Sequence, residues 1–237
     1  MGKLLIIIPT YNEAENIKSF LEKIYNSCLN LDFSVLVVDD NSPDGTAKIV
    51  DEWIIDHSNC HILKREKKDG LGKAYIAGFK WGLTKNFDYF CHIDADFSHN
   101  PEYIPLFLEK IQNYDFIIGS RYVKGGGVEG WGILRKLISR GGSLYSKIIL
   151  SSRINDFTGG FNLWKKEVLE SIDLDSLFSS GYSFQIEMKY RAIKKGFKYY
   201  EYPIIFIDRE NGKSKMSKSI VFEAMINVLK LRFNKIK

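Results

Sequence analysis

The chain has 237 residues, of which 45% are hydrophobic and 27% charged, and this composition predicts one globular domain with a sizeable core. The three cysteines, Cys28, Cys60 and Cys91, form no C-x-x-C pair, which argues against a zinc site or a disulfide framework and favours a reducing compartment. No apolar run approaches the roughly twenty residues of a membrane span. Residues 1–3 lead directly into a strand-like run, so we expect no signal peptide and a soluble or peripheral protein.

Apolar runs and helical patterns alternate along the first half of the chain. We expect strands near residues 3–8, 33–38, 60–64, 88–93 and 115–118, separated by helices near 13–28, 45–57, 72–85 and 101–112. This repeating β-α order predicts an α/β fold whose central sheet is mainly parallel and flanked by helices. Beyond Arg121 a glycine-rich stretch precedes expected helices near 133–151, 165–172 and 183–195, a strand near 197–207, a loop over 208–219 and a C-terminal helix near 219–235.

Acidic residues follow three of the expected strands. Glu13 comes after the first, Asp39 ends the second, and Asp94 and Asp96 come after the fourth. Parallel strands point their carboxyl ends the same way, so these side chains should converge on one rim, where open α/β sheets bind ligands. Turn chemistry explains part of the pattern, because residues 41–45 read Asn-Ser-Pro-Asp-Gly.

The pair Asp94 and Asp96 forms an Asp-x-Asp motif directly after an apolar run. Two carboxylates so close together suit a divalent cation that also binds a diphosphate. The competing interpretation is a pair of solvated loop acids, which is the commoner fate of an isolated motif of this kind.

Positive charge is concentrated in two segments of the second half. Residues 121–153 and 209–237 each carry a net charge of +6, whereas the remainder carries −7. Both segments contain basic amphipathic helices, near 133–151 and 219–235, of the type that lies in a lipid interface. Packing of these helices on the protein's own core is the alternative.

The motifs taken together resemble the inverting GT-A glycosyltransferases, and among them the dolichyl-phosphate (polyprenol-phosphate) mannose synthases. The resemblance covers nearly the whole chain and rests on Pro9-Thr10-Tyr11-Asn12-Glu13, Val38-Asp39-Asp40-Asn41-Ser42-Pro43-Asp44-Gly45-Thr46, Gly70-Leu71-Gly72, Asp94-Ala95-Asp96, Gly119-Ser120-Arg121-Tyr122, Ser139-Arg140-Gly141 and Asp156-Phe157-Thr158-Gly159-Gly160-Phe161. It implies a GT-A fold, Rossmann-like, in a single domain over residues 1–237. Residues 1–120 would form the nucleotide-sugar half, 121–207 the acceptor half with its amphipathic helix, and 208–237 a loop and a C-terminal amphipathic helix.

The resemblance also assigns roles to residues. It implies that the nucleotide is held by Pro9, Tyr11, Glu13, Val37 and Asp39, that Asp94 and Ala95 contact the donor, and that Asp96, with Asp94 nearby, binds Mg²⁺ or Mn²⁺. Arg121, Arg135 and Ser139 match positions that bind the acceptor phosphate, and Arg209 and Lys215 match loop residues that reach the diphosphate. Asp94, Asp96 and Arg121 are the expected catalytic residues. Ser98 stands where some relatives have a glutamine as a further metal ligand.

The implied reaction is transfer of a hexose, mannose from GDP-mannose, to a polyprenyl or dolichyl phosphate. A phosphate monoester is mostly dianionic at neutral pH and needs no strong catalytic base. It needs cations that orient it, for which the planar fork of arginine is well suited. The chain would then act on the cytosolic face of a membrane, that of the endoplasmic reticulum in a eukaryote, brought there by its own helices or by a small membrane-embedded subunit.

Three alternatives stay open at this point. The first is use of UDP-glucose with a polyprenyl phosphate acceptor, and the second is a GT-A enzyme with a glycan acceptor. The third is a nucleotide- or nucleic-acid-binding protein, which the clustered aspartates disfavour because they would repel a nucleic-acid backbone. A P-loop NTPase is excluded, since residues 70–74 lack the Walker spacing and its Ser or Thr.

Overall fold

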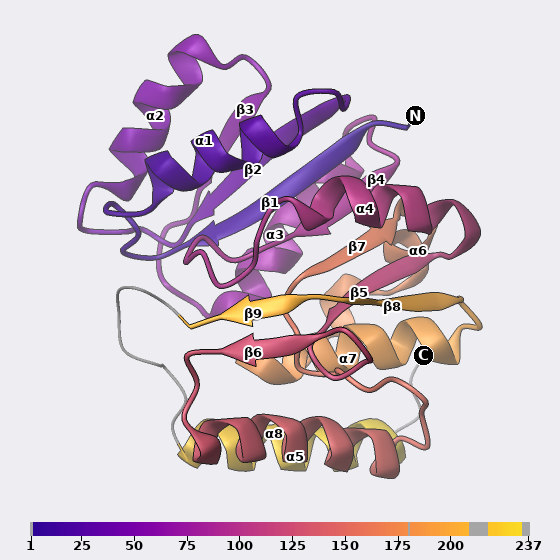
Figure 1. Cartoon of the computed structure of the whole chain (residues 1–237). Helices are drawn as coiled ribbons and strands as arrows, with labels where there is room; N and C mark the ends of the chain where they lie inside the picture. Colours follow the sequence, from indigo (N-terminus) through magenta and orange to yellow (C-terminus); the bar gives the residue numbers. More distant parts are fainter. Residues whose placement is uncertain (1, 180, 209–217, 234–237) are drawn as a thin grey trace.

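A seven-stranded sheet forms the centre of the computed structural model (Figure 1), which describes residues 2–179, 181–208 and 218–233. Its strand order is β3-β2-β1-β4-β7-β5-β8, with β1 over Leu4–Thr10, β2 Phe33–Asp39, β3 Cys60–Lys64, β4 Tyr89–His92, β5 Phe116–Ser120, β7 Asn162–Lys165 and β8 Tyr199–Pro203. Strand β7 runs antiparallel to both its neighbours and the other pairs in this sheet are parallel, so the expectation of a mainly parallel sheet is confirmed.

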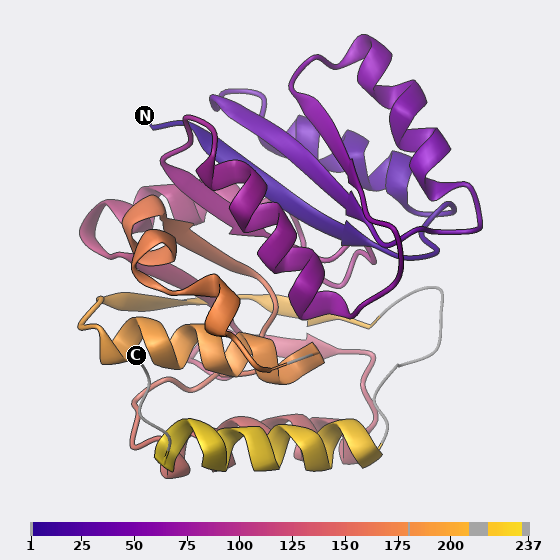
Figure 2. The same cartoon turned by 180° about the vertical axis from the view of Figure 1, so that it is seen from behind.

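Helices cover both faces of this sheet. Successive side chains of β1 point to opposite faces: Leu5 and Ile7 join one buried cluster, whereas Leu4, Ile6 and Ile8 join the other. Helices α3 (Leu71–Leu83), α6 (Lys166–Ser171) and α7 (Gly181–Lys194) cover the first cluster, and α1 (Ile17–Ser27) and α4 (Tyr103–Lys110) cover the second; α2 (Thr46–Asp56) packs beside α1 and β3 (Figure 2).

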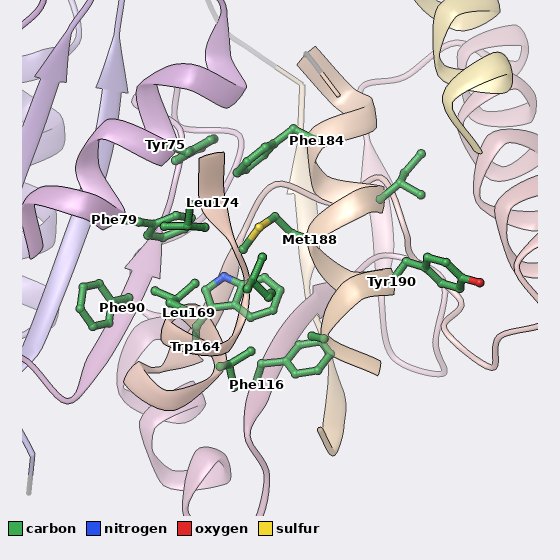
Figure 3. Close-up of a cluster of buried hydrophobic side chains, with 14 of the residues drawn as sticks. Tyr75, Phe79, Phe90, Phe116, Trp164, Leu169, Leu174, Phe184, Met188 and Tyr190 are labelled. Atoms are coloured by element: carbon green, nitrogen blue, oxygen red, sulfur yellow. The ribbon is translucent and has the colours of Figure 1, made fainter. Parts of the chain in front are cut away.

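The first cluster is built on aromatic contacts. Figure 3 shows Tyr75 and Phe79 of α3 facing Phe184 and Met188 of α7. Trp164 of β7 lies between the elements, stacked on Phe116 with ring centroids 4.8 Å apart. Aromatic side chains of this size bury 150–250 Å² each in typical cores, so this cluster fixes how α7 sits on the sheet.

Helices α5 (Ile133–Ile149) and α8 (Lys218–Phe233) form a further layer. They lie side by side beyond α7, as both views show (Figures 1 and 2), and α8 packs against both α5 and α7. None of the helices in the described part of the chain combines the length and the apolar character that spanning a bilayer requires.

The sequence does not predict two of the strands. Strand β7 has only four residues, and β6 (Gly127–Glu129) has three and lies within the glycine-rich stretch. The expected strand near 197–207 is in fact two strands in different sheets, because β9 (Ile205–Ile207) pairs with β6. Between them, the Ile204 N–H donates to the Ser120 carbonyl of one sheet and its carbonyl accepts from Gly127 of the other. Two short 3₁₀ helices, Ile111–Asn113 and Leu174–Ser176, complete the described elements.

Candidate active site

Two adjoining pockets lie at the carboxyl ends of the parallel strands. The first, called the aspartate pocket, follows β1, β2 and β4 and reaches the start of α3. Its lining comprises Pro9, Thr10, Tyr11, Glu13, Asp40, Lys68, Gly70, Leu71, Ala74, Asp94, Ala95, Asp96 and Gly181. Six residues that the resemblance assigns to the donor are thereby brought together: Pro9, Tyr11, Glu13, Asp94, Ala95 and Asp96.

Two further residues with the same assignment lie elsewhere. The side chain of Val37 is fully buried in the core, in the cluster beneath α1, and it does not line the pocket. The Asp39 carboxylate is also buried; its Oδ1 accepts hydrogen bonds from Thr10 Oγ1 (2.9 Å) and Ser42 Oγ (2.6 Å), and its Oδ2 accepts from the Ser42 N–H (2.9 Å). In this geometry Asp39 holds the loop after β2 against the end of β1. Of the three hydrogen-bonded residues Thr10, Asp39 and Ser42, Thr10 lines the pocket.

The loops after β1 and β2 are tied to each other at this edge. The Glu13 N–H donates to Thr46 Oγ1 (2.9 Å), and the Ala14 N–H donates to the Asp44 carboxylate (3.0 Å). Asn12 and Asn41 have φ values of 60° and 58°, a left-handed conformation that asparagine tolerates better than most residues. The pocket wall is therefore fixed by the turn residues of both loops.

Two residues that the sequence analysis did not assign add charge to this pocket. The Lys68 ammonium lies 3.7 Å from the centroid of the Tyr11 ring, a cation–π contact. Asp40 is paired with Arg65, and burial raises the pKa of the Asp40 carboxyl although Arg65 works in the opposite direction. Lys68 thus adds a cation to the pocket that Asp94 and Asp96 also line.

Asp94 and Asp96 follow β4 in a tight turn. Asp94 Oδ1 accepts a hydrogen bond from the Tyr75 hydroxyl (2.6 Å), and burial, together with Asp94, raises the pKa of Tyr75 so that the phenol stays protonated. Asp96 Oδ1 accepts from the Ser98 N–H (3.1 Å). Phe97, which follows Asp96, adopts φ 59°, a strained conformation for a bulky residue. Its ring packs edge-on against the ring of Phe20, with the two ring centroids 5.2 Å apart.

The second pocket, called the arginine pocket, lies between the sheet and helices α5, α7 and α8. Its lining comprises Leu71, Asp94, His99, Arg121, Trp131, Arg135, Ile138, Ser139, Gly142, Tyr145, Ser146, Thr158, Gly160, Gly181, Gln185, Ile186, Phe206, Ala224, Met225 and Val228. It shares Leu71, Asp94 and Gly181 with the aspartate pocket. The expected acceptor residues Arg121, Arg135 and Ser139 therefore line one pocket, which Asp94 also lines, whereas Asp96 lines only the aspartate pocket.

Arg121 is held by a buried carboxylate. Its Nε and Nη2 donate to the two oxygens of Asp156, each at 2.7 Å, and Nη2 also donates to Thr158 Oγ1 (2.8 Å). Burial alone would raise the pKa of Asp156, but the Arg121 guanidinium lowers it to about 2. Bidentate pairs of this kind fix the plane of a guanidinium, so Arg121 reaches the pocket as an oriented cation.

Arg135 and Ser139 lie on α5, one turn apart. The Arg135 guanidinium stacks 4.2 Å from the Trp131 ring centroid, and its Nη1 donates to Asp208 (2.6 Å). Ser139 Oγ accepts from the Tyr122 hydroxyl (2.7 Å). The pocket is thus lined by two guanidinium groups that lie against aromatic rings.

Sequence reasoning missed the groups that hold this pocket in shape. Lys189 of α7 is fully buried, and its ammonium donates to the carbonyls of Asp156 (3.1 Å), Phe157 (3.1 Å) and Gly159 (2.7 Å). Burial lowers the pKa of Lys189 to about 7. Glu201 accepts from the backbone of Asn155 and Asp156, each at 2.9 Å. Nothing local marks Lys189 or Glu201, because their partners are distant in the sequence.

The expected ligands Arg209 and Lys215 lie outside the described residues. No group of three or more His, Cys, Asp or Glu side chains placed to hold a metal ion occurs within residues 2–179, 181–208 and 218–233. The two aspartates nevertheless suit a cation that takes its remaining ligands from a diphosphate and water, which is the usual mode of Mg²⁺.

A mainly parallel α/β sheet with an Asp-x-Asp turn at its carboxyl edge is the arrangement of the GT-A glycosyltransferases. The model of glycosyl transferase family 2 matches residues 5–173. This chain therefore belongs to glycosyl transferase family 2 and is a glycosyltransferase.

Two curated relatives align over almost the whole chain. An undecaprenyl-phosphate mannosyltransferase of Micrococcus luteus is 46% identical over 226 residues, covering 95% of this chain and 92% of the relative. A polyprenol monophosphomannose synthase of Mycolicibacterium smegmatis is 44% identical over 228 residues, covering 95% and 85%.

A solved structure shares the fold at low sequence identity. The glucosyl-3-phosphoglycerate synthase of Mycobacterium tuberculosis, in complex with Mn²⁺, UDP and phosphoglyceric acid, superposes with a TM-score of 0.72 at 16% identity, covering 98% of this chain and 79% of that one. The expected GT-A fold is thereby confirmed.

Proposed function

We propose that this chain transfers mannose from GDP-mannose to the phosphate of a polyprenyl phosphate, inverting the anomeric configuration, with Mg²⁺ or Mn²⁺ in the aspartate pocket. The names of the two curated relatives support the sugar and the acceptor class. In this proposal residues 1–120 bind the nucleotide sugar, and residues 121–207 with the C-terminal segment bind the acceptor.

The observation that carries the proposal is the composition of the arginine pocket. Its lining combines Arg121, Arg135 and Ser139 with largely apolar side chains of three helices: Ile138, Tyr145, Ile186, Ala224, Met225 and Val228. Guanidinium groups suit a phosphate, and the apolar part of the lining suits the first isoprene units behind it. The phosphate then lies toward the junction with the aspartate pocket.

The aspartate pocket fits the donor. Asp96 and Asp94 would hold the divalent ion, and Lys68 adds a second positive charge toward the diphosphate. The ion, when bound, supplies Lewis-acid stabilisation of the departing nucleoside diphosphate. Pro9, Tyr11 and Glu13 line the same pocket and would contact the nucleotide.

The bond changes follow from these positions. A phosphate oxygen of the acceptor attacks the anomeric carbon from the side of the arginine pocket and forms the new C–O bond. The bond between that carbon and the diphosphate oxygen breaks, and its electron pair leaves with the nucleotide. Because the acceptor phosphate is already ionised at neutral pH, no residue has to remove a proton from it.

The layer of α5 and α8 would bring the site to its substrate. Their outward sides expose Leu134 (71%), Leu137 (64%) and Phe222 (65%), and basic residues of the same helices stand beside them. Apolar side chains flanked by Lys and Arg favour the surface of an anionic bilayer. A peripheral location on a cytosolic membrane face follows from this proposal, and a membrane-embedded partner subunit would be an additional or alternative anchor.

The experiment that tests the function is a transfer assay with labelled sugar nucleotides and polyprenyl phosphate. We expect label to enter the organic phase with GDP-mannose and a divalent ion, and to stay in the aqueous phase when the ion is chelated. Transfer from UDP-glucose alone would replace the proposed donor, and absence of lipid-linked product from every donor would overturn the proposed function.

A further inference from the structure

Gln185 of α7 presents a buried amide to the arginine pocket. The residue is 2% exposed, it lines the pocket, and its Nε2 has no hydrogen-bond partner within the described part of the chain. Burying a hydrogen-bond donor without a partner is unfavourable, so such a group at a pocket wall indicates a position where a ligand can accept a hydrogen bond.

The orientation of this amide follows from donor and acceptor counting. The indole Nε1 of Trp164 can only donate, and it contacts His92 Nδ1 at 3.2 Å. Because His92 Nδ1 accepts the indole hydrogen, the ring's own proton sits on Nε2. His92 Nε2 lies 3.0 Å from Gln185 Oε1 and therefore donates to it.

Asn162 brings a second hydrogen to the same oxygen. Its Nδ2 also lies 3.0 Å from His92 Nε2, to which it cannot donate because that nitrogen carries the proton, so its two hydrogens go to Gln185 Oε1 (3.1 Å) and to the Gly159 carbonyl (3.2 Å). With two donors on one side, the Gln185 oxygen is fixed toward the core. Its NH₂ group is consequently directed to the pocket.

The position of that NH₂ group is marked by Gly160. A Cβ built on Gly160 would lie 3.5 Å from Asp94 Oδ2 and 3.9 Å from Gln185 Nε2. Asp94 lines both pockets, so this point is at their junction. A hydrogen-bond donor and a carboxylate thus face one small space that a glycine leaves open.

We propose that Gln185 and Asp94 together bind one hydroxyl group of the donor sugar, and that Gln185 is a specificity-determining residue of the reaction. A hydroxyl can accept from the amide and donate to the carboxylate at the same time. A phosphate oxygen only accepts, and the Asp94 carboxylate would repel it. The inference rests on the proposed function, because it takes the ligand at the junction to be the sugar of a nucleotide sugar.

The test compares Gln185→Glu with the unmodified chain. Glutamate keeps an oxygen for His92 and Asn162 but turns an acceptor toward the pocket. We expect affinity for GDP-mannose, measured by calorimetry with Mg²⁺, to fall about tenfold, the factor that corresponds to one hydrogen bond. Affinity for GDP should stay within twofold. Gln112→Glu is the matched control and should change neither value. Gln112 lies in the 3₁₀ helix Ile111–Asn113, where its Nε2 donates to the hydroxyl of Tyr89, the first residue of β4.

Deoxy analogues of GDP-mannose identify the hydroxyl. With the unmodified chain, kcat/KM for one analogue should be about tenfold lower than kcat/KM for GDP-mannose. With Gln185→Glu, kcat/KM for that analogue and for GDP-mannose should be equal. Gly160→Ala supplies a second variant, since its Cβ would make only ordinary contacts; it should fold normally and weaken the sugar nucleotide but not GDP.

Three outcomes decide the matter. Unchanged affinity of Gln185→Glu for GDP-mannose, or equal losses for all analogues in both proteins, would overturn the inference while the proposed function stands. A rise confined to the KM for polyprenyl phosphate would assign the amide to the acceptor instead. If the unmodified chain transfers sugar from no sugar nucleotide, the proposed function is wrong, and the inference, which rests on it, is wrong as well.

Discussion

Arg121 and Asp156, 35 positions apart in the sequence, form a buried bidentate pair in which Nε and Nη2 of the guanidinium each lie 2.7 Å from a carboxylate oxygen. The Arg121 N–H also donates to Asp156 Oδ2 (2.9 Å), so side chain and backbone are bound to one carboxylate. This pair orients the cation that we assign to the acceptor phosphate.

Arg121→Lys keeps the charge and removes the fork. One ammonium cannot replace both bonds to Asp156 and the bond to Thr158, so we expect unfolding free energy to fall by about 1–3 kcal/mol. The KM for polyprenyl phosphate should rise while GDP-mannose affinity changes little. Arg153→Lys, an exposed substitution in the same basic segment, is the control. An equal loss of donor affinity would place Arg121 on the diphosphate instead.

Asp96→Asn removes a charge from the aspartate pocket and keeps an oxygen for the Ser98 N–H. Loss of the ion's stabilisation of the leaving group corresponds to several kcal/mol, which is a rate loss of at least about 100-fold. Thermal unfolding should stay close to that of the unmodified chain, and the exposed Asp56→Asn should leave both quantities unchanged. Full activity in a folded Asp96→Asn protein would refute the metal assignment.

The sheet and the aspartate pocket could be predicted because they depend on local signals. Continuous apolar runs define the parallel strands, and acids directly after them must meet at one edge. Val37 and Asp39 show what such local signals leave open: the Val37 side chain packs in the core, and hydrogen bonds to Thr10 and Ser42 hold the Asp39 carboxylate at the end of β2.

The arginine pocket could be predicted only in part. Arg135 and Ser139 lie on one helix that the sequence marks as amphipathic. The other groups come from separate segments: Asp156, which holds Arg121, lies in a loop, and Lys189 and Gln185 lie on α7, whose residues 183–192 are buried. The short strand β7, which carries Asn162 and Trp164, has no local signature either.

Lys189 predicts a pH dependence of stability. Its pKa is about 7 in the folded chain against an ordinary 10.5, so between these values the unfolded chain binds the extra proton and the folded chain does not. By linkage, the unfolding free energy then rises with pH from about 7 to 10.5. Denaturation of Lys189→Met should lack this slope, whereas the exposed Lys194→Met should keep it. An identical slope in Lys189→Met would contradict the assignment.

Leu134→Ser combined with Leu137→Ser tests the contact of α5 with lipid. Both side chains are mostly exposed, so the double variant should unfold at the same temperature as the unmodified chain. We expect the unmodified chain to float with liposomes that contain anionic lipid, less so at high salt, and the double variant to stay in solution. Ile55→Ser, at an exposed position of α2, is the apolar control. Equal flotation of all three proteins would rule out α5 as the contact.

The central claim is that the arginine pocket takes a phosphate as nucleophile, and comparing undecaprenyl phosphate with undecaprenol under identical conditions tests it most directly. With GDP-mannose and Mg²⁺, we predict labelled lipid from the phosphate and background counts from the alcohol, because the alcohol lacks both the charge for Arg121 and Arg135 and an ionised oxygen. The rate with the phosphate should rise as pH passes its second pKa of about 6. Comparable transfer to undecaprenol, or transfer only to a water-soluble glycan, would contradict the account.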